Sequence, residues 1–67
     1  MVIGRIYLIN TYIGNALIGI LDKENGFITF IVTDFIEPEH IGEIHTLSEQ
    51  SLSRYIISIV PYATSFR

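Results

Sequence analysis

Side chains that branch at Cβ dominate the chain and favour β-strands. The 67 residues include 14 isoleucines, 3 valines and 5 threonines, but only 2 alanines. Such side chains lose rotamer freedom in a helix, whereas they pack well on a pleated sheet. The sequence therefore predicts an all-β fold, and its length leaves room for a single domain over residues 1–67.

Turn signals divide the chain into five predicted strands. The turn Thr11–Asn15 and the hairpin loop Asp22–Gly26 hold glycine and asparagine, which tolerate positive φ. Pro38 and Pro61 end the strands before them, because proline donates no backbone hydrogen bond. The polar segment Ser48–Arg54 has room for one helical or 3₁₀ turn. The predicted strands are Val2–Asn10, Ala16–Leu21, Phe27–Ile36, Ile41–Leu47 and Tyr55–Val60. Their lengths and short connections are typical of a small antiparallel barrel.

The chain has more apolar side chains than one buried face can hold. On the last predicted strand, Ile57 and Ile59 face one way and Ile56 and Val60 the other, so several of them must meet water in a monomer. A chain this short buries only about 60% of its unfolded surface. It has no cysteine for disulfides or thiolate zinc sites. Long apolar edge strands without lysine or internal proline also favour pairing between chains. We therefore expect self-association.

The charge balance limits the possible partners. The formal net charge is −3 and the pI is near 5.0, so the chain cannot form the broad basic face that duplex nucleic acid or an anionic membrane requires. Its longest uncharged run, Ile6–Leu21, has 16 residues, is interrupted by polar ones, and is too short for a spanning helix. With no secretory pattern and no cysteine, we expect a cytoplasmic protein that does not enter the membrane.

The sequence offers little for catalysis or metal binding. It holds no cysteine, no Gly-x-Ser-x-Gly elbow, no phosphate loop and no His-Glu-x-x-His motif, so we predict that it is not an enzyme. The one metal constellation is Glu37–His45, in which Glu43 and His45 share a strand face near Glu37, Glu39 and His40. These ligands suit zinc or nickel, but an acidic loop in solvent explains them more simply. Since no tight spacing selects a geometry, we predict no metal and no cofactor.

Four segments follow one another in the order and spacing of a known family. They are Gly4–Asn10 (GRIYLIN), Leu17–Leu21 (LIGIL), Glu24–Val32 (ENGFITFIV) and Ser53–Pro61 (SRYIISIVP). Together they resemble the first core strand, the bent second strand, the loop with the third strand, and the second motif of the Sm-like family. The similarity is closest to the bacterial Hfq branch and covers about residues 4–61.

The resemblance implies both an architecture and a function. It implies a five-stranded, SH3-like or Sm-like barrel in a homo-oligomeric ring of about five to seven subunits, which binds single-stranded RNA near its pore. The matching positions are Asn25 and Phe27 in the first loop, and Arg54 and Tyr55 before the last strand. Aromatic rings stack on bases for about 1–3 kcal/mol each. Arginine can meet a phosphate, and asparagine a base edge.

The residues leave one alternative open. An SH3-like protein-interaction or assembly module would use its exposed isoleucine-rich edges to bind another protein and would bind no nucleic acid. The low number of basic residues favours this alternative. Convergence of Asn25, Phe27, Arg54 and Tyr55 at one mouth would favour RNA binding. A broad apolar groove away from them would favour a protein partner.

Overall fold

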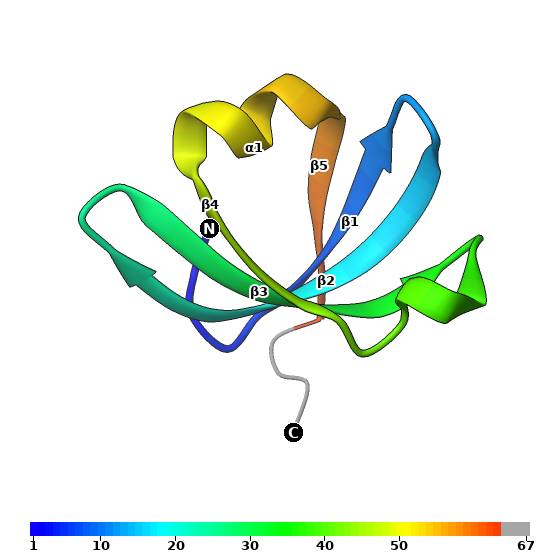
Figure 1. Ribbon diagram of the computed structural model, residues 1–67, viewed down its shortest axis with the longest axis horizontal. Coiled ribbons are helices and arrows are strands. Elements are labelled where there is room, and N and C mark those ends of the chain that lie inside the picture. Colours follow the sequence, from blue (N-terminus) through cyan, green and yellow to red (C-terminus); the bar gives the residue numbers. More distant parts are fainter. Residues whose placement is uncertain (64–67) are drawn as a thin grey trace.

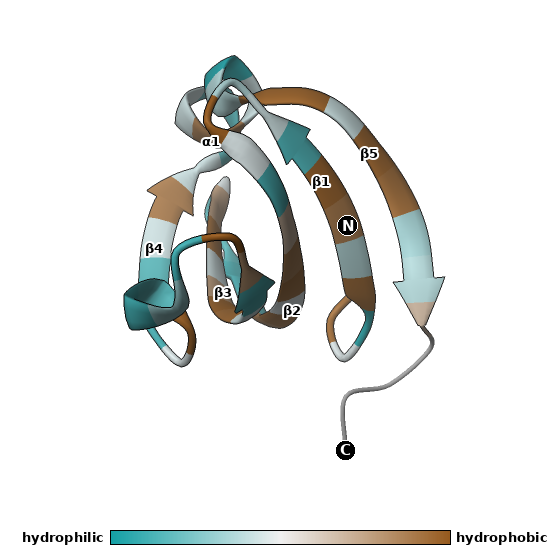
Figure 2. Ribbon diagram, turned by 90° about the vertical axis from the view of Figure 1, so that its right-hand side faces the viewer, coloured by the Kyte–Doolittle hydropathy of each residue, from teal (hydrophilic) through white to brown (hydrophobic). Residues whose placement is uncertain are grey.

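The strands of the computed structural model, which describes residues 1–63, form one antiparallel sheet in the order β4-β3-β2-β1-β5 (Figure 1). The elements are β1 (Ile6–Thr11), β2 (Gly14–Glu24), β3 (Phe27–Phe35), the 3₁₀ helix η1 (Pro38–His40), β4 (Ile44–Ser48), α1 (Glu49–Tyr55) and β5 (Ile56–Ala63). The sheet curls so that its edge strands β4 and β5 stand on either side, and α1 joins them at one end (Figure 2). The prediction of a small, five-stranded, all-β fold is confirmed.

The turns are tighter than predicted, so β2 is longer. Asn25 and Gly26 both take positive φ, 53° and 80°, as a two-residue hairpin turn requires. At the other end, β2 begins at Gly14, directly after the two-residue turn Tyr12-Ile13. The strand therefore runs to Glu24, beyond the predicted limits Ala16–Leu21.

Two predicted strands begin later in the structure. β1 begins at Ile6 and not at Val2, because Gly4 has a φ of +87° and the Arg5 N–H donates to the Val2 carbonyl in a turn. β4 begins at Ile44 and not at Ile41, because η1 and a second turn, with Gly42 at a φ of +93°, precede it. In both cases a glycine in the left-handed region interrupts the extended backbone.

The polar segment before the last strand forms a helix longer than one turn. Ser48 is its N-cap, and its hydroxyl oxygen accepts a hydrogen bond of 3.1 Å from the Ser51 N–H. Only Leu52 of α1 is buried. The helix includes Tyr55, so β5 starts one residue later than predicted, at Ile56.

Pro61 lies inside β5, which corrects the prediction that it ends the strand. It pairs with Tyr7 of β1, next to a register shift between Ile6 and Tyr7. An edge strand with a bulge tolerates a residue that has no N–H. The sequence argument that both apolar edges lack an internal proline is therefore wrong for β5.

The core lies on the concave face of the sheet. Along β3, Ile28, Phe30 and Val32 point into it and alternate with less buried residues. The buried apolar residues are Tyr7, Ile9, Ala16, Ile18, Ile20, Ile28, Phe30, Val32 and Leu52. Many apolar residues stay outside, as expected for a monomer. The exposed large ones are Val2, Ile3, Tyr12, Ile13, Phe27, Ile36, Ile41, Ile44, Tyr55, Ile57, Ile59, Val60 and Tyr62.

Candidate functional site

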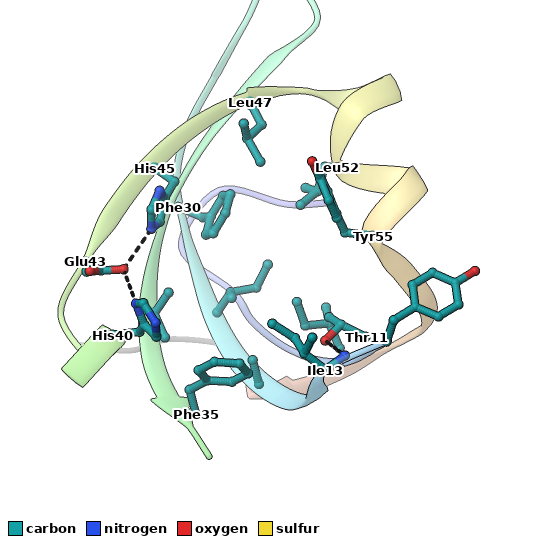
Figure 3. A pocket seen from close by; sticks show the side chains of 15 residues that line it. Thr11, Ile13, Phe30, Phe35, His40, Glu43, His45, Leu47, Leu52 and Tyr55 are labelled. Carbon is teal, nitrogen blue, oxygen red and sulfur yellow. Dashed lines mark hydrogen bonds and ion pairs between the residues drawn. The ribbon is translucent and has the colours of Figure 1, made fainter. Parts of the chain in front are cut away.

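An apolar groove of about 470 Å³ opens on the concave side of the sheet (Figure 3). Its buried lining includes core residues of three strands, Ile9, Ile18 and Phe30. Leu47 of β4 and Leu52 of α1 line it as well. The groove therefore leads from the surface to the core, and an apolar group that entered it would contact core side chains directly.

The β1–β2 turn supplies the exposed apolar side of the groove. The Thr11 hydroxyl donates to the Gly14 carbonyl at 2.6 Å, and its oxygen accepts from the Ile13 N–H at 3.3 Å. These bonds brace the turn that carries Tyr12 and Ile13, which are largely exposed and line the groove together with Tyr55 of α1. The groove thus has a rim of large apolar side chains in contact with water.

The opposite rim is polar. Both imidazoles donate to the same carboxylate oxygen, Oε1 of Glu43: His40 Nδ1 at 2.9 Å and His45 Nε2 at 3.2 Å (Figure 3). The rings also pack on aromatic residues of β3, with centroid distances of 5.6 Å for Phe30–His45 and 5.9 Å for Phe35–His40. The three side chains form a fixed cluster, which we call the His-Glu-His rim.

Charge couples the members of this rim. The hydrogen bond with Glu43 raises the pKa of His40, and the charges of Glu43, Glu37 and Glu39 add to that effect. The hydrogen bond from His40, followed by that from His45, lowers the pKa of Glu43. Glu37 also lies 3.5 Å from His40 Nε2. The rim is therefore an acidic patch that keeps a charged carboxylate at the groove.

We expect the titration of His40 to report this coupling directly. The pKa of His40 should exceed its ordinary value of 6.5 in NMR titrations of the ring protons, and Glu43→Gln should bring it down toward that value. The exposed control Glu24→Gln should leave it unchanged. The stabilising contribution from His40 is complete below pH 6.5 and disappears as pH rises through its raised pKa. The stabilising contribution from Glu43 is complete above pH 4.5 and disappears as pH falls through the lowered pKa of this residue. If the pKa of His40 were the same in Glu43→Gln as in the wild type, the coupling would be contradicted.

Metal-ligating side chains also gather beside this rim. Ligand atoms of Glu37, Glu39 and His40 lie within 4.8 Å of one another. They provide three ligand atoms, fewer than the four of a closed zinc site, and both nitrogens of His40 already face carboxylates. Exposed acidic groups often gather in this way without an ion, and the expectation that no metal binds stays a prediction.

The four residues expected to contact RNA lie at opposite ends of α1. Asn25 lies in the β2–β3 turn and Phe27 begins β3 directly after it. The Gly26 carbonyl between them accepts a 2.9 Å hydrogen bond from the N–H of Glu49, the first residue of α1. Arg54 and Tyr55 are the last two residues of the same helix (Figure 1). Among the four, only Tyr55 lines the groove. Within one chain, the structure does not bring them to one mouth.

Sequence reasoning overlooked the residues that shape the groove. The sequence pattern predicts only a turn at Tyr12 and Ile13, although two large apolar residues at a turn tip are themselves a signal of a binding surface. For His40, Glu43 and His45 the pattern suggests metal ligands and not a rim. Their place beside Phe30 and Leu47 depends on strand pairing that the sequence does not reveal.

The chain matches no protein-family model, no curated protein and no solved structure. Within the part of the chain that the structure describes, neither helix has the length and apolar character needed to cross a membrane. Fold and site define a small all-β protein with an open apolar groove.

Proposed function

We propose that the protein is a non-enzymatic interaction module whose groove binds an apolar segment of another protein. The observation that carries this proposal is the open groove of about 470 Å³ that reaches the core. Its volume lies in the range of natural binding sites, about 300–1,000 Å³. Filling it would remove apolar surface from water, at about 25 cal/mol per Å². A cytoplasmic location, expected from the cysteine-free sequence, belongs to the same proposal.

Charge favours a protein over RNA as the occupant. No lysine or arginine is among the described residues that line the groove, and Glu43 lies on its rim with Glu37 and Glu39 nearby. An RNA backbone would meet repulsion there, because phosphate contacts depend on basic side chains. The separation of the four candidate RNA contacts points the same way.

Selection from a displayed peptide library tests the groove. Peptides that bind the wild-type protein should be rich in apolar residues and should bind Ile13→Asp at least about tenfold more weakly, because the aspartate would be desolvated against an apolar ligand. Ile36→Asp is the matched control, since Ile36 is 71% exposed and Ile13 is 73% exposed, but only Ile13 lines the groove. Fluorescence anisotropy of labelled peptides gives the affinities. Failure to enrich any peptide, or equal binding to both variants, would overturn the proposal.

An RNA-binding, Sm-like ring is the second candidate function. What favours it is the exposure of both stacking candidates, 46% for Phe27 and 61% for Tyr55, which leaves their rings available to bases. The exposed residues Ile57 and Ile59 of β5 would serve as contacts between subunits of a ring with about five to seven copies. Asn25 and Arg54 would add polar contacts to the RNA, and a ring would combine several weak sites.

Mass and oligonucleotide binding test this second candidate together. Light scattering after size exclusion at two salt concentrations should give about five to seven times the 7.6 kDa of the chain, and Ile57→Lys should reduce the mass. The double variant Phe27→Ala, Tyr55→Ala should bind short uridine- or adenine-rich RNA at least about tenfold more weakly, with its mass unchanged. A folded monomer that binds neither RNA would exclude this candidate.

A further inference from the structure

β4 is an edge strand that forms one wall of the groove. His45 and Leu47 line the groove, whereas Thr46 faces away, since its hydroxyl lies 2.9 Å from that of Thr29. Ile44 shares the outer face with Thr46, because side chains alternate along a strand. Any strand added beside β4 would extend this wall, and every second side chain of that strand would face the groove.

The backbone of β4 has free hydrogen-bonding groups along its outer edge. Val32 of β3 donates to the Glu43 carbonyl at 2.9 Å and accepts from the Gly42 N–H at 2.7 Å. Bonded pairs recur at every second residue of an antiparallel ladder. The Glu49 N–H donates to the Gly26 carbonyl. Glu49 lies six residues after Glu43, an even number, so the residues between them that bond to β3 are His45 and Leu47. Ile44 and Thr46 therefore direct their N–H and C=O groups away from β3.

The rim adds a charge requirement. Both imidazoles bind Oε1 of Glu43, and Oε2 makes no hydrogen bond within residues 1–63. Glu37 and Glu39 lie close enough to His40 for their charges to act on it. A carboxylate with a free oxygen beside an apolar groove is complementary to an ammonium or guanidinium group on the occupant.

We propose that the occupant is an extended segment of another protein that pairs with the free edge of β4. Its alternate apolar side chains enter the groove, and a lysine or arginine lies next to Oε2 of Glu43. In such strand addition, main-chain hydrogen bonds provide affinity and side-chain pockets provide specificity. The inference rests on the proposed function, because it names the partner of the same groove.

The free edge favours a strand over a helix as the occupant. A helix satisfies its own backbone and would leave the groups of Ile44 and Thr46 unpaired beside it. β4 also lacks two of the usual protections against strand addition, since its sequence IHTLS contains neither lysine nor proline. β5, at the other edge, contains Pro61.

Hydrogen exchange of the β4 amides is the direct test. The probes are acetylated eight-residue peptides that alternate leucine and threonine. Each carries a single lysine, placed at the first position in one peptide and at the last position in the other. On binding, the amides of Ile44 and Thr46 should exchange at least about tenfold more slowly, while those of His45 and Leu47, already paired with β3, should change little. Two sets of the same peptides, N-methylated at the odd or at the even residues, test the backbone hydrogen bonds. The set that loses the N–H groups facing β4 should bind at least about tenfold more weakly.

The charge is tested with matched peptides and variants. Lysine should improve binding about two- to fivefold over glutamine at the same position, the range expected for an exposed ion pair. Glu43→Gln should remove that preference, and the exposed control Glu24→Gln should keep it. Equal preference in both variants would overturn the basic partner.

The other possible results distinguish failure of the proposed function from failure of strand addition to β4. If neither these peptides nor the displayed library bind, the proposed function and this inference both fail. Binding that Ile13→Asp abolishes, but that leaves Ile44 and Thr46 unprotected and tolerates N-methylation in both phases, would overturn the strand alone. A dimer without peptide whose β4 amides are already protected would show that a second copy covers this edge, which would also overturn the inference.

Discussion

Replacing Ile20 with alanine is expected to lower the free energy of unfolding by about 2–5 kcal/mol, the usual range for a buried isoleucine. Its side chain is 0% exposed. Its carbonyl accepts from the Gly4 N–H at 2.8 Å, and its N–H donates to the Arg5 carbonyl at 3.0 Å. The cavity would therefore form in the core beneath a point where β2 also binds the N-terminal segment through its backbone. Since a domain of this length has about 3–10 kcal/mol of stability, the loss would be a large part of the total.

Urea unfolding followed by circular dichroism measures this loss. Ile36→Ala is the control, because its side chain is largely exposed and its truncation should change the free energy of unfolding by less than about 0.5 kcal/mol. Similar midpoints for the two variants would show that the concave face of the sheet is not the core.

Leu52→Ala is expected to have a comparable effect, about 2–5 kcal/mol, for a different reason. Leu52 is the one buried residue of α1. It lines both the groove and a second pocket of about 390 Å³ that lies toward β5. Truncating it would remove the contact between helix and sheet and join the two spaces. We therefore expect a lower urea midpoint together with stronger binding of an apolar dye.

Gln50→Ala is the control for the helix itself. Gln50 is exposed on α1, and alanine has the higher helix propensity, so this variant should be as stable as the wild type or slightly more so. A Leu52→Ala protein with unchanged stability and dye binding would mean that α1 does not close the concave face.

Local chemistry was enough to predict the strands and one turn. Cβ-branched residues favour extended backbone wherever they lie, and Asn25-Gly26 forms a tight hairpin because both residues tolerate positive φ. Ile28, Phe30 and Val32 share one face of β3 because side chains alternate along a strand, and that face is the buried one. These signals act between neighbours in the chain and need no tertiary context.

The predicted strand limits were wrong where the effect of a local signal depends on its surroundings in the fold. Proline blocks pairing only on the side where its N–H would be needed, so the effect of Pro61 followed from the edge position of β5. Gly4 and Gly42 delay the start of β1 and β4, although their apolar neighbours favour extended backbone.

The site was the least predictable part. Phe27 and Tyr55 looked alike in the sequence, as exposed aromatics near loops, yet α1 separates them and only Tyr55 reaches the groove. The groove joins the turn at Ile13, the rim at Glu43 and the helix at Leu52, which are far apart in the chain. By itself, the sequence determined an acidic, all-β domain of five strands with too many apolar side chains for one core. The tertiary structure alone decided which of them meet at one opening, because that depends on strand order and curl, which arise from long-range pairing.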